Sequence, residues 1–217
     1  QFNSKEDLFQ ITERTVCVLV EPVQAEAGVI VPKDDFLTTL RQRCSETGTL
    51  LIFDEIQTGF GRTGKLFCFM DYNVTPDILC IADKKIMLTL THNPDFGRIT
   101  TFGGHPVSAA AAIATLEELT KNPNLINQVD EKGAIYESAL KNHSLVKGIR
   151  RKGLLISIEL PTVEINQKII QKLLQNGLVT DPFFFMPQAF RIAPPLIITK
   201  DEIALTIELI NKTFKNL

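Results

Sequence analysis

The sequence predicts an α/β protein that begins with a large domain built on a mostly parallel sheet and ends with a smaller α/β domain. Three strand-like segments are continuous apolar runs: residues 15–22, 49–55 and 77–82. A segment with helical periodicity, residues 33–48, lies between the first two of them. Helices and strands alternate again after about Asn122. Continuous apolar strands joined by helices are typical of parallel sheets that are buried on both faces.

The helix at residues 33–48 is predicted from one apolar face and a stop signal. The apolar positions recur at helical spacing: Phe36, Leu37, Leu40 and Cys44. Gly48 stands where a helix of this length would end, because glycine accepts the left-handed conformation of a helix terminus. This amphipathic helix is expected to cover one face of the sheet.

The later part of the chain predicts a further series of elements. We expect helices at residues 106–121, 124–142, 163–177 and 199–214, and strands at residues 149–160 and 189–196. Thr199 and Glu202 have the spacing of a capping box at the start of the last helix. We expect residues 1–122 to be the C-terminal part of the large domain and residues 123–217 to be the small domain.

Composition and charge exclude several classes of partner. The chain has 217 residues, is 44% hydrophobic and carries a net charge of −2, which is ordinary for a globular protein. Such a charge gives no electrostatic reason to expect nucleic acid or an acidic membrane as a partner. Arg150, Arg151 and Lys152 form the densest basic cluster, interpreted as a solvated strand entry. No apolar run approaches the ~18 residues that a membrane span needs, and we expect no secretory signal.

The cysteines and histidines predict a cytoplasmic protein without a metal site. Cys17, Cys44, Cys68 and Cys80 are scattered and form no C-x-x-C pair. Cys17 and Cys80 stand in apolar strand-like runs, where a reduced cysteine behaves as a small buried hydrophobe. The three histidines, His92, His105 and His143, have no spacing typical of metal ligands.

The segment "TLLIFDEIQTGFGRTG", residues 49–64, contains the glycine pattern G-x-G-x-x-G. A dinucleotide fold would need its first glycine directly after the strand and a helix that opens at the third. Four residues, 55–58, intervene here, and a short aromatic segment follows Gly64. Asp77 begins its strand, whereas a ribose-binding acid should end one. We therefore reject the dinucleotide interpretation.

Asp54 ends the second apolar strand, at the edge where open α/β sheets bind their ligands. A carboxylate that is buried there needs a cation or hydrogen-bond donors. A protonated pyridine nitrogen would satisfy it, and a carboxylate beside a pyridine ring keeps that ring cationic and able to accept electrons. Gln57 is close enough in sequence to reach an oxygen of the same ring.

Four segments in order resemble class-III pyridoxal-phosphate aminotransferases, the family of ornithine, acetylornithine and γ-aminobutyrate aminotransferases. They are "EPVQAEAG", "LLIFDEIQTGFGRTG", "TTFGGHPVSAAAA" and "FRIAPPL". Together they cover most of the chain. The resemblance implies fold type I of the pyridoxal-phosphate-dependent transferases, a homodimer with shared active sites, and an amino donor and a 2-oxo acid as substrates.

The resemblance also implies a role for individual residues around the cofactor. Asp54 would pair with the pyridine nitrogen, Gln57 would contact the phenolic oxygen of the ring, and Ile56 would pack on one ring face. Thr101 would donate its hydroxyl to the cofactor phosphate of the partner subunit. Each has a structural alternative: Asp54 could be a turn or helix cap, and Thr101 could cap the helix that follows it.

Two further residues would bind the substrates. Arg191 would bind the carboxylate of the 2-oxo acid with both branches of its guanidinium group. Glu26 would pair with Arg191 when the amine-bearing end of the other substrate must be admitted. The alternatives are a surface strand residue for Arg191 and a solvated turn acid for Glu26.

One catalytic residue of the family has no counterpart. The resemblance requires a lysine that forms a Schiff base with the cofactor and follows the strand at residues 76–82 directly. Asp83 stands there, and Lys84 and Lys85 resemble the start of the helix that comes after the lysine segment. Either the chain lacks this segment, or a mobile loop at this point is not represented in the sequence. We favour the second interpretation, because the family pattern resumes after Asp83.

These observations predict a pyridoxal-phosphate-dependent aminotransferase that moves an amino group from an amino acid or ω-amine donor to 2-oxoglutarate. The donor would resemble ornithine, acetylornithine or lysine. The alternatives are an aminomutase or racemase on the same scaffold, or a catalytically silent homologue without the Schiff-base lysine.

Overall fold

The computed structural model describes the whole chain except residues 34, 84–85, 92–105 and 217. The chain divides into two compact units. Unit 1 consists of Gln1–Val23, Pro32–Gly61 and Lys65–Pro123, and unit 2 consists of Gln24–Val31, Arg62–Gly64 and Asn124–Leu217. Among the helices in the described part of the chain, none has both the length and the apolar character that a membrane crossing requires.

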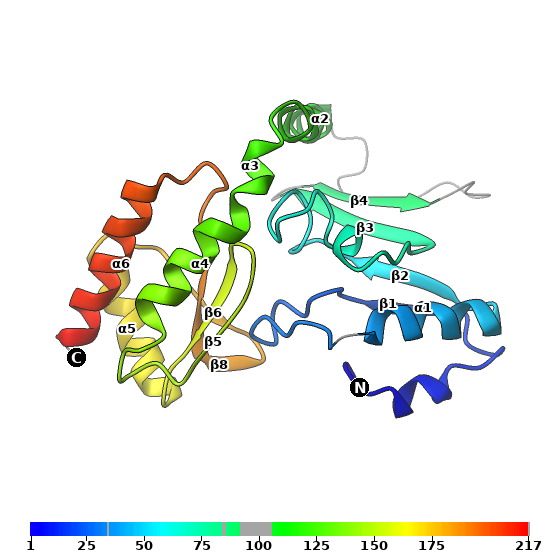
Figure 1. The fold of residues 1–217 in the computed structure, drawn as a ribbon, viewed down its shortest axis with the longest axis horizontal. Coiled ribbons are helices and arrows are strands. Elements are labelled where there is room, and N and C mark those ends of the chain that lie inside the picture. Colours follow the sequence, from blue (N-terminus) through cyan, green and yellow to red (C-terminus); the bar gives the residue numbers. More distant parts are fainter. Residues whose placement is uncertain (34, 84–85, 92–105, 217) are drawn as a thin grey trace. The chain divides into compact units, whose positions relative to one another are not determined.

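Unit 1 is built on a four-stranded sheet with the strand order β1-β2-β3-β4 (Figure 1). Its elements are the 3-10 helices η1 (Glu6–Gln10) and η2 (Cys68–Asp71), the strands β1 (Cys17–Val20), β2 (Leu50–Asp54), β3 (Ile78–Asp83) and β4 (Ile86–Thr91), and the helices α1 (Phe36–Thr47) and α2 (Pro106–Lys121). The pairs β1–β2 and β2–β3 are parallel, whereas β3–β4 is antiparallel. The predicted mixed architecture with parallel strands is confirmed.

Helix α1 covers one face of this sheet, as its sequence predicts. The four residues of its expected apolar face are buried: Phe36, Leu37, Leu40 and Cys44. They form a core with the inward side chains of the strands, among them Leu51 and Phe53. Gly48 ends the helix with a φ of 68°, the left-handed conformation that glycine adopts without strain.

The opposite face of the same sheet is apolar but open to solvent. Leu19 is 63% exposed and Leu50 is 43% exposed, and Cys17 is exposed as well. The expectation that β1 is buried on both faces, with Cys17 as a buried hydrophobe, is therefore wrong. The physical reason is that the described part of the chain leaves Cys17, Leu19 and Leu50 largely uncovered, and a run of apolar residues cannot itself reveal which face is covered.

Strand β4 replaces a helix that we expected after Asp83. Residues 86–91 pair antiparallel with β3, in a register that joins Asp83 to Ile86 and Ile78 to Thr91. Two residues separate the strands in the sequence. The expected helix at this point is therefore wrong, whereas the interpretation that a lysine segment is not represented in the sequence stays a prediction.

Unit 2 contains a second four-stranded sheet, with the order β5-β6-β8-β7 and antiparallel pairs throughout. Its elements are the helices α3 (Asn124–Asn127), α4 (Val129–Leu140), α5 (Val163–Gln175) and α6 (Lys200–Lys215), and the strands β5 (Gly148–Lys152), β6 (Leu155–Glu159), β7 (Pro182–Phe183) and β8 (Met186–Ile192). The single strand expected at residues 149–160 is a hairpin instead, because the chain turns at Gly153, whose φ is 59°. Strand β7 was not expected.

Helices α4, α5 and α6 pack together against one face of this sheet (Figure 1), and α6 contacts both of the others. The face that they cover carries apolar side chains from adjacent strands, such as Ile158 and Phe190, which are opposite each other in the register. Both are fully buried. The small α/β fold expected for the end of the chain therefore has a complete core of its own.

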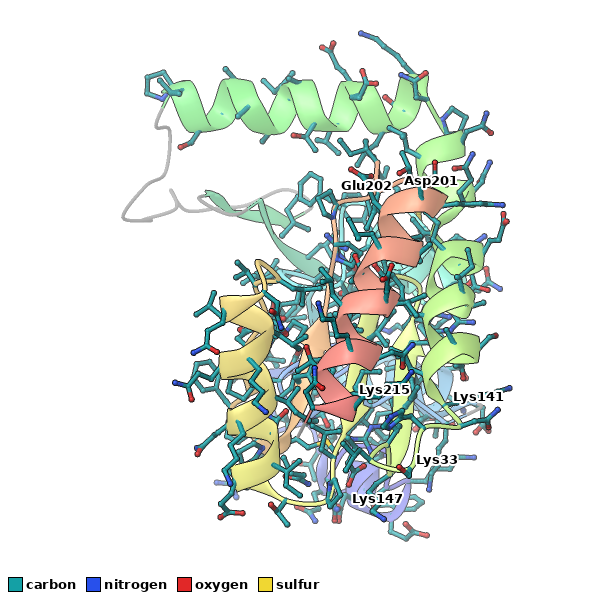
Figure 2. All side chains as sticks on the ribbon, turned by 90° about the vertical axis from the view of Figure 1, so that its left-hand side faces the viewer. Lys33, Lys141, Lys147, Asp201, Glu202 and Lys215 are labelled. Carbon is teal, nitrogen blue, oxygen red and sulfur yellow. The ribbon has the colours of Figure 1, made fainter. Side chains whose placement is uncertain are left out.

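Helix α6 has the signals at both ends that favour a helix. Thr199 accepts a hydrogen bond from Glu202 N, and the Glu202 side chain accepts one from Thr199 N, so the predicted capping box is confirmed. Figure 2 shows Asp201 and Glu202 at the first turn and Lys215 at the last. Acidic residues at the start and basic residues at the end both stabilise the helix dipole.

Candidate functional site

Asp54, Ile56 and Gln57 lie in one tight turn at the carboxyl end of β2. The Asp54 side chain is half-buried, and its Oδ1 accepts a hydrogen bond from Ile56 N at 3.0 Å. No other donor to this carboxylate is found among the described residues. Ile56 is 38% exposed, and Gln57 is half-buried. The turn thus presents an acid, an aliphatic side chain and an amide where a parallel sheet binds its ligands.

Glu55 has a different role from its neighbour Asp54. It is fully buried and accepts hydrogen bonds from Cys68 N at 2.5 Å, from Phe69 N at 2.7 Å and from the Thr58 hydroxyl at 3.3 Å. Burial raises the pKa of Glu55 above its usual range, although these three donors act in the opposite direction. Through these bonds Glu55 joins the start of η2 to the end of β2, a role that the sequence did not reveal.

The glycines of residues 59–64 shape a compact loop. Gly59 N donates to Glu55 O at 3.0 Å, and a Cβ atom at Gly59 would lie 2.9 Å from that oxygen. Gly61 and Gly64 have φ values of 82° and 94°. The next element is the 3-10 helix η2, which begins at Cys68, so no α-helix opens at the third glycine. The rejection of a dinucleotide site agrees with this geometry.

Arg62, between these glycines, belongs to unit 2 by its contacts. Its Nη1 donates to Pro194 O at 2.5 Å, and its backbone carbonyl accepts from Leu154 N at 3.0 Å. Burial lowers the pKa of the guanidinium group, which nevertheless stays charged at neutral pH. A Cβ atom at Gly153 would lie 2.7 Å from Arg62 O, so this close approach requires glycine. Sequence reasoning missed Arg62 because both of its partners are distant in the chain.

Glu26 and Arg191 form the ion pair that the resemblance implies. Arg191 Nη2 lies 2.6 Å from Glu26 Oε1, and the two side chains are only 16% and 19% exposed. Glu26 stands on a turn closed by a bridge between Gln24 and Ile30. Thus neither side chain is a solvated surface residue.

Among the described residues, Phe183, Asp181 and Thr180 also contact Arg191. Its guanidinium carbon lies 4.7 Å from the centre of the Phe183 ring, a cation–π contact. Its Nε lies 3.6 Å from Asp181 Oδ1, an ion pair in which Asp181 is 67% exposed. The Thr180 hydroxyl donates to the Arg191 carbonyl at 2.5 Å, which fixes the strand beneath.

The basic cluster at residues 150–152 does not form a solvated strand entry. Arg150 Nε donates to the Gly28 carbonyl at 2.7 Å and so holds the turn that carries Glu26. Arg151 pairs with Asp130 at 2.6 Å and Glu137 at 2.7 Å. The interpretation as a solvated entry is therefore wrong, because the register of three strands turns Arg150 to the same face as Arg191.

Asp77 acts within the fold rather than on a ligand. Its Oδ2 accepts from Leu51 N at 2.7 Å and lies 2.7 Å from Arg41 Nη1. Burial alone would raise the pKa of Asp77, but Arg41 and the Leu51 amide outweigh it and leave that pKa lowered. The acid thus joins the start of β3 to β2 and α1.

Several residues of interest lie outside the described part of the chain. They are Thr101, expected to reach a cofactor phosphate, together with Lys84, Lys85, His92 and His105. The roles expected for them stay predictions.

Comparisons with known proteins agree with the resemblance. The family model described as Aminotransferase class-III matches residues 3–214. A putrescine aminotransferase of Pectobacterium atrosepticum is 36% identical over 220 residues, which cover 92% of this chain and 47% of that protein. The chain therefore spans about half the length of this curated relative.

Solved structures give the same result. An ornithine aminotransferase from Plasmodium yoelii matches with a TM-score of 0.86 and 32% identity, over 99% of this chain and 61% of the other. An acetylornithine aminotransferase from Elizabethkingia anophelis matches with a TM-score of 0.85 and 29% identity, over 98% of this chain and 55% of the other. The fold therefore corresponds to part of each of these proteins.

Proposed function

The chain belongs to the class-III aminotransferase family, and we propose that it is a pyridoxal-phosphate-dependent aminotransferase that transfers an amino group from an amino acid or ω-amine donor to 2-oxoglutarate. The observation that carries this proposal is the half-buried ion pair between Glu26 and Arg191. An aminotransferase must accept an amine donor and a 2-oxo diacid in turn at one site. An arginine that can exchange an internal carboxylate for a substrate carboxylate meets this requirement.

The residues at the end of β2 fit the proposed cofactor. Asp54 has one carboxylate oxygen bonded to the Ile56 amide and can offer the other to a cationic donor. Bound pyridoxal phosphate withdraws electrons from the substrate as long as its ring nitrogen is protonated. Asp54 would accept a hydrogen bond from the protonated ring nitrogen, Gln57 would donate its amide hydrogen to the ring oxygen, and Ile56 would pack against the ring face. Thr101 extends the proposal to a homodimer, in which it binds the phosphate of the partner subunit's cofactor.

Arg191 and Glu26 select the substrate end that enters. Arg191 binds the carboxylate of 2-oxoglutarate through two parallel N–H donors, which a lysine could not offer. When the amine donor binds, Glu26 stays on Arg191 and neutralises its charge. The Phe183 ring and Asp181 keep the guanidinium group oriented in both cases.

The relatives indicate the class of donor. Their names refer to putrescine, ornithine and acetylornithine, which share an amine on a flexible aliphatic chain. We propose a donor of this class, with the distal amine as the group transferred.

A second candidate function is favoured by the pairing of β3 with β4. Only two residues separate these strands in the sequence, at the point where the resemblance places the lysine segment. A chain without that lysine would bind cofactor and substrate carboxylates without turnover. This alternative is a catalytically silent homologue.

Cofactor binding and turnover separate these two candidates. Equilibrium dialysis of the full chain with pyridoxal phosphate should give saturable binding, and Asp54→Asn should weaken it by about tenfold or more, because a charge-assisted bond is lost. Glu13→Gln, which removes an exposed acid, is the matched control and should bind as the unaltered chain does.

Glutamate production from 2-oxoglutarate with putrescine, ornithine or N-acetylornithine then tests turnover. Glutamate formation supports the aminotransferase. Saturable binding without glutamate supports the silent homologue. If Asp54→Asn binds the cofactor as tightly as the unaltered chain, the cofactor role of this turn is wrong.

We also propose a cytoplasmic location. None of the four cysteines, all of which lie in the described part of the chain, forms a disulfide, and Cys44 and Cys68 are buried. Cysteines that do not form disulfides are typical of proteins in a reducing compartment.

A further inference from the structure

The tip of the β7–β8 hairpin is bonded to Glu26. This tip consists of Phe184 and Phe185, whose side chains are 84% and 82% exposed. Phe184 N donates to Glu26 Oε2 at 3.2 Å, and Phe185 N donates to the backbone carbonyl of Glu26 at 3.1 Å. Two large apolar side chains are thus held in solvent by the acid that pairs with Arg191.

The two carboxylate oxygens of Glu26 have different partners. Oε1 accepts from Arg191 Nη2 at 2.6 Å, while Oε2 accepts from Phe184 N. A carboxylate is a rigid planar group, so a rotation that takes Oε1 away from Arg191 also moves Oε2 away from Phe184. The main-chain bond from Phe185 does not depend on that rotation.

The turn that carries Glu26 is fixed, so that the movement is confined to the side chain. Within this turn, the Gly28 carbonyl accepts a hydrogen bond from Arg150, and Gly28 has a φ of 86°. Val29 is fully buried with a φ of 59°, a strained conformation for a β-branched residue that persists only when the surroundings enforce it.

Charge determines which acid a ligand carboxylate displaces from Arg191. Glu26 is the closer and more buried of the two acids beside the guanidinium group, whereas Asp181 is largely exposed and its charge is screened by water. A further carboxylate that approached Arg191 while Glu26 stayed in place would be repelled by Glu26 in the low-dielectric surroundings of the pair. The arriving carboxylate must therefore replace Glu26.

We propose that a ligand carboxylate that replaces Glu26 on Arg191 also releases Phe184 and Phe185, which then close on the apolar part of that ligand and determine its specificity. This inference rests on the role proposed above for Arg191. The bond from Phe185 to the Glu26 main chain acts as the pivot about which the tip moves.

Amide hydrogen exchange of the full chain tests the coupling. Saturation with 2-oxoglutarate should accelerate exchange at the Phe184 amide by about tenfold or more, because its acceptor is lost. The Phe185 amide should change by less than about twofold, since its acceptor is a backbone carbonyl. Glu26→Gln without ligand should produce the same pattern, because Arg191 and Phe184 N use different oxygens of Glu26 and the amide group of glutamine replaces one of them with an NH2 donor.

Asp181→Asn is the matched control for charge near Arg191. It removes an acid that does not bind the tip, so exchange at Phe184 should stay unchanged in the absence of ligand. If calorimetry shows that 2-oxoglutarate binds but Phe184 exchange does not change, the coupling is wrong while the role of Arg191 stands. If 2-oxoglutarate does not bind, the role of Arg191 is wrong, and Glu26→Gln alone decides the coupling.

Specificity provides a second readout. Phe184→Ala keeps the backbone donor but removes the ring. It should weaken binding of 4-methyl-2-oxopentanoate by about fivefold or more and that of pyruvate by less than about twofold, because only the former has an apolar chain for the ring to cover. Equal losses for both 2-oxo acids would contradict closure of the ring on the ligand.

Discussion

The sheets of the two units have the same number of strands but differ in how their faces are covered. In unit 2, helices α4, α5 and α6 cover one face of the sheet. On the other face, Arg150 and Arg191 bind the turn that carries Glu26. In unit 1, α1 covers one face, while the opposite face exposes apolar side chains such as Leu19 and Leu50. Parallel strands are ordinarily buried on both faces.

In unit 2, three helices cover the apolar face of the sheet. In unit 1, α1 covers one face of the sheet, and apolar side chains stay exposed on the opposite face. The largest buried cluster of unit 2 contains residues from all of its longer helices and central strands. We therefore expect unit 2 to be the more stable unit and expect substitutions in unit 1 to have opposite outcomes on its two faces. Six substitutions test this comparison.

Phe190→Ala should have the largest effect. Phe190 is fully buried in unit 2, and its ring centre lies 6.4 Å from that of Phe214. The lost ring leaves a cavity that costs about 3–5 kcal/mol of unfolding free energy. Urea unfolding combined with hydrogen exchange in each unit measures the loss, which should be confined to unit 2. Phe184→Ala, at an exposed position, is the control and should cost less than about 0.5 kcal/mol.

Leu51→Ala and Leu50→Ala compare the two faces of unit 1 at adjacent positions. Leu51 is fully buried, whereas Leu50 is 43% exposed. We expect a loss of about 2–4 kcal/mol for Leu51→Ala and less than about 1 kcal/mol for Leu50→Ala. Urea unfolding of both variants measures the difference. Similar losses would mean that the exposed face is covered in solution.

Glu55→Gln should destabilise unit 1 by about 1–3 kcal/mol, because its two backbone donors need an acceptor each and an amide offers only one oxygen. The folded-state pKa of Glu55 is raised, so the stability linked to its proton is fully present below the unfolded value of about 4.3 and is lost as the pH rises through the folded-state pKa.

Unfolding of the Glu55→Gln variant at several pH values checks this sign. The stability of the unaltered chain minus that of the variant should decrease from about pH 4 towards neutrality. Glu13→Gln should show no such trend. An increase with pH would contradict the raised pKa.

Asp77→Asn in unit 1 and Glu137→Gln in unit 2 should have the smallest effects, about 0.5–1 kcal/mol each. Asp77 is 39% exposed and Glu137 is 40% exposed, so water screens both ion pairs.

Because the pKa of Asp77 is lowered, the contribution of its carboxylate to the free energy of unfolding should be present above the unfolded value of about 3.9. It should be lost as the pH falls through the folded-state pKa. Thermal unfolding at neutral pH and at about pH 3 measures this. A large difference between the variants at neutral pH would show that ion pairs, rather than apolar burial, distinguish the units.

Much of the candidate site could be predicted because local chemistry fixes it. The position of Asp54 after an apolar run places it at the end of a strand, and the structure has it there with Ile56 and Gln57 in the same turn. The different roles of Asp54 and Glu55 could not be predicted, because two of the three donors to Glu55 come from η2, 13 and 14 residues further along the chain.

The pair of Glu26 and Arg191 was implied by resemblance and not by the residues alone. The two are 165 residues apart in sequence, and their meeting depends on the register of β8 and on the turn at residues 24–30. The role of Arg150 was missed for the same reason. The alternation of side chains along a strand predicts which residues share a face of the sheet, but it does not predict which other segments pack on that face.

The sequence by itself determined the local features: the apolar face of α1 with its glycine end, the capping box of α6, and the strand that delivers Asp54. These depend on side-chain spacing and on backbone preferences over a few residues. Only the tertiary structure decided that β1 has an open face, that residues 86–91 pair with β3 as a strand, and that Glu26 binds Arg191 and the Phe184 amide together. Each of these depends on contacts between distant segments, whose free energy outweighs local propensity.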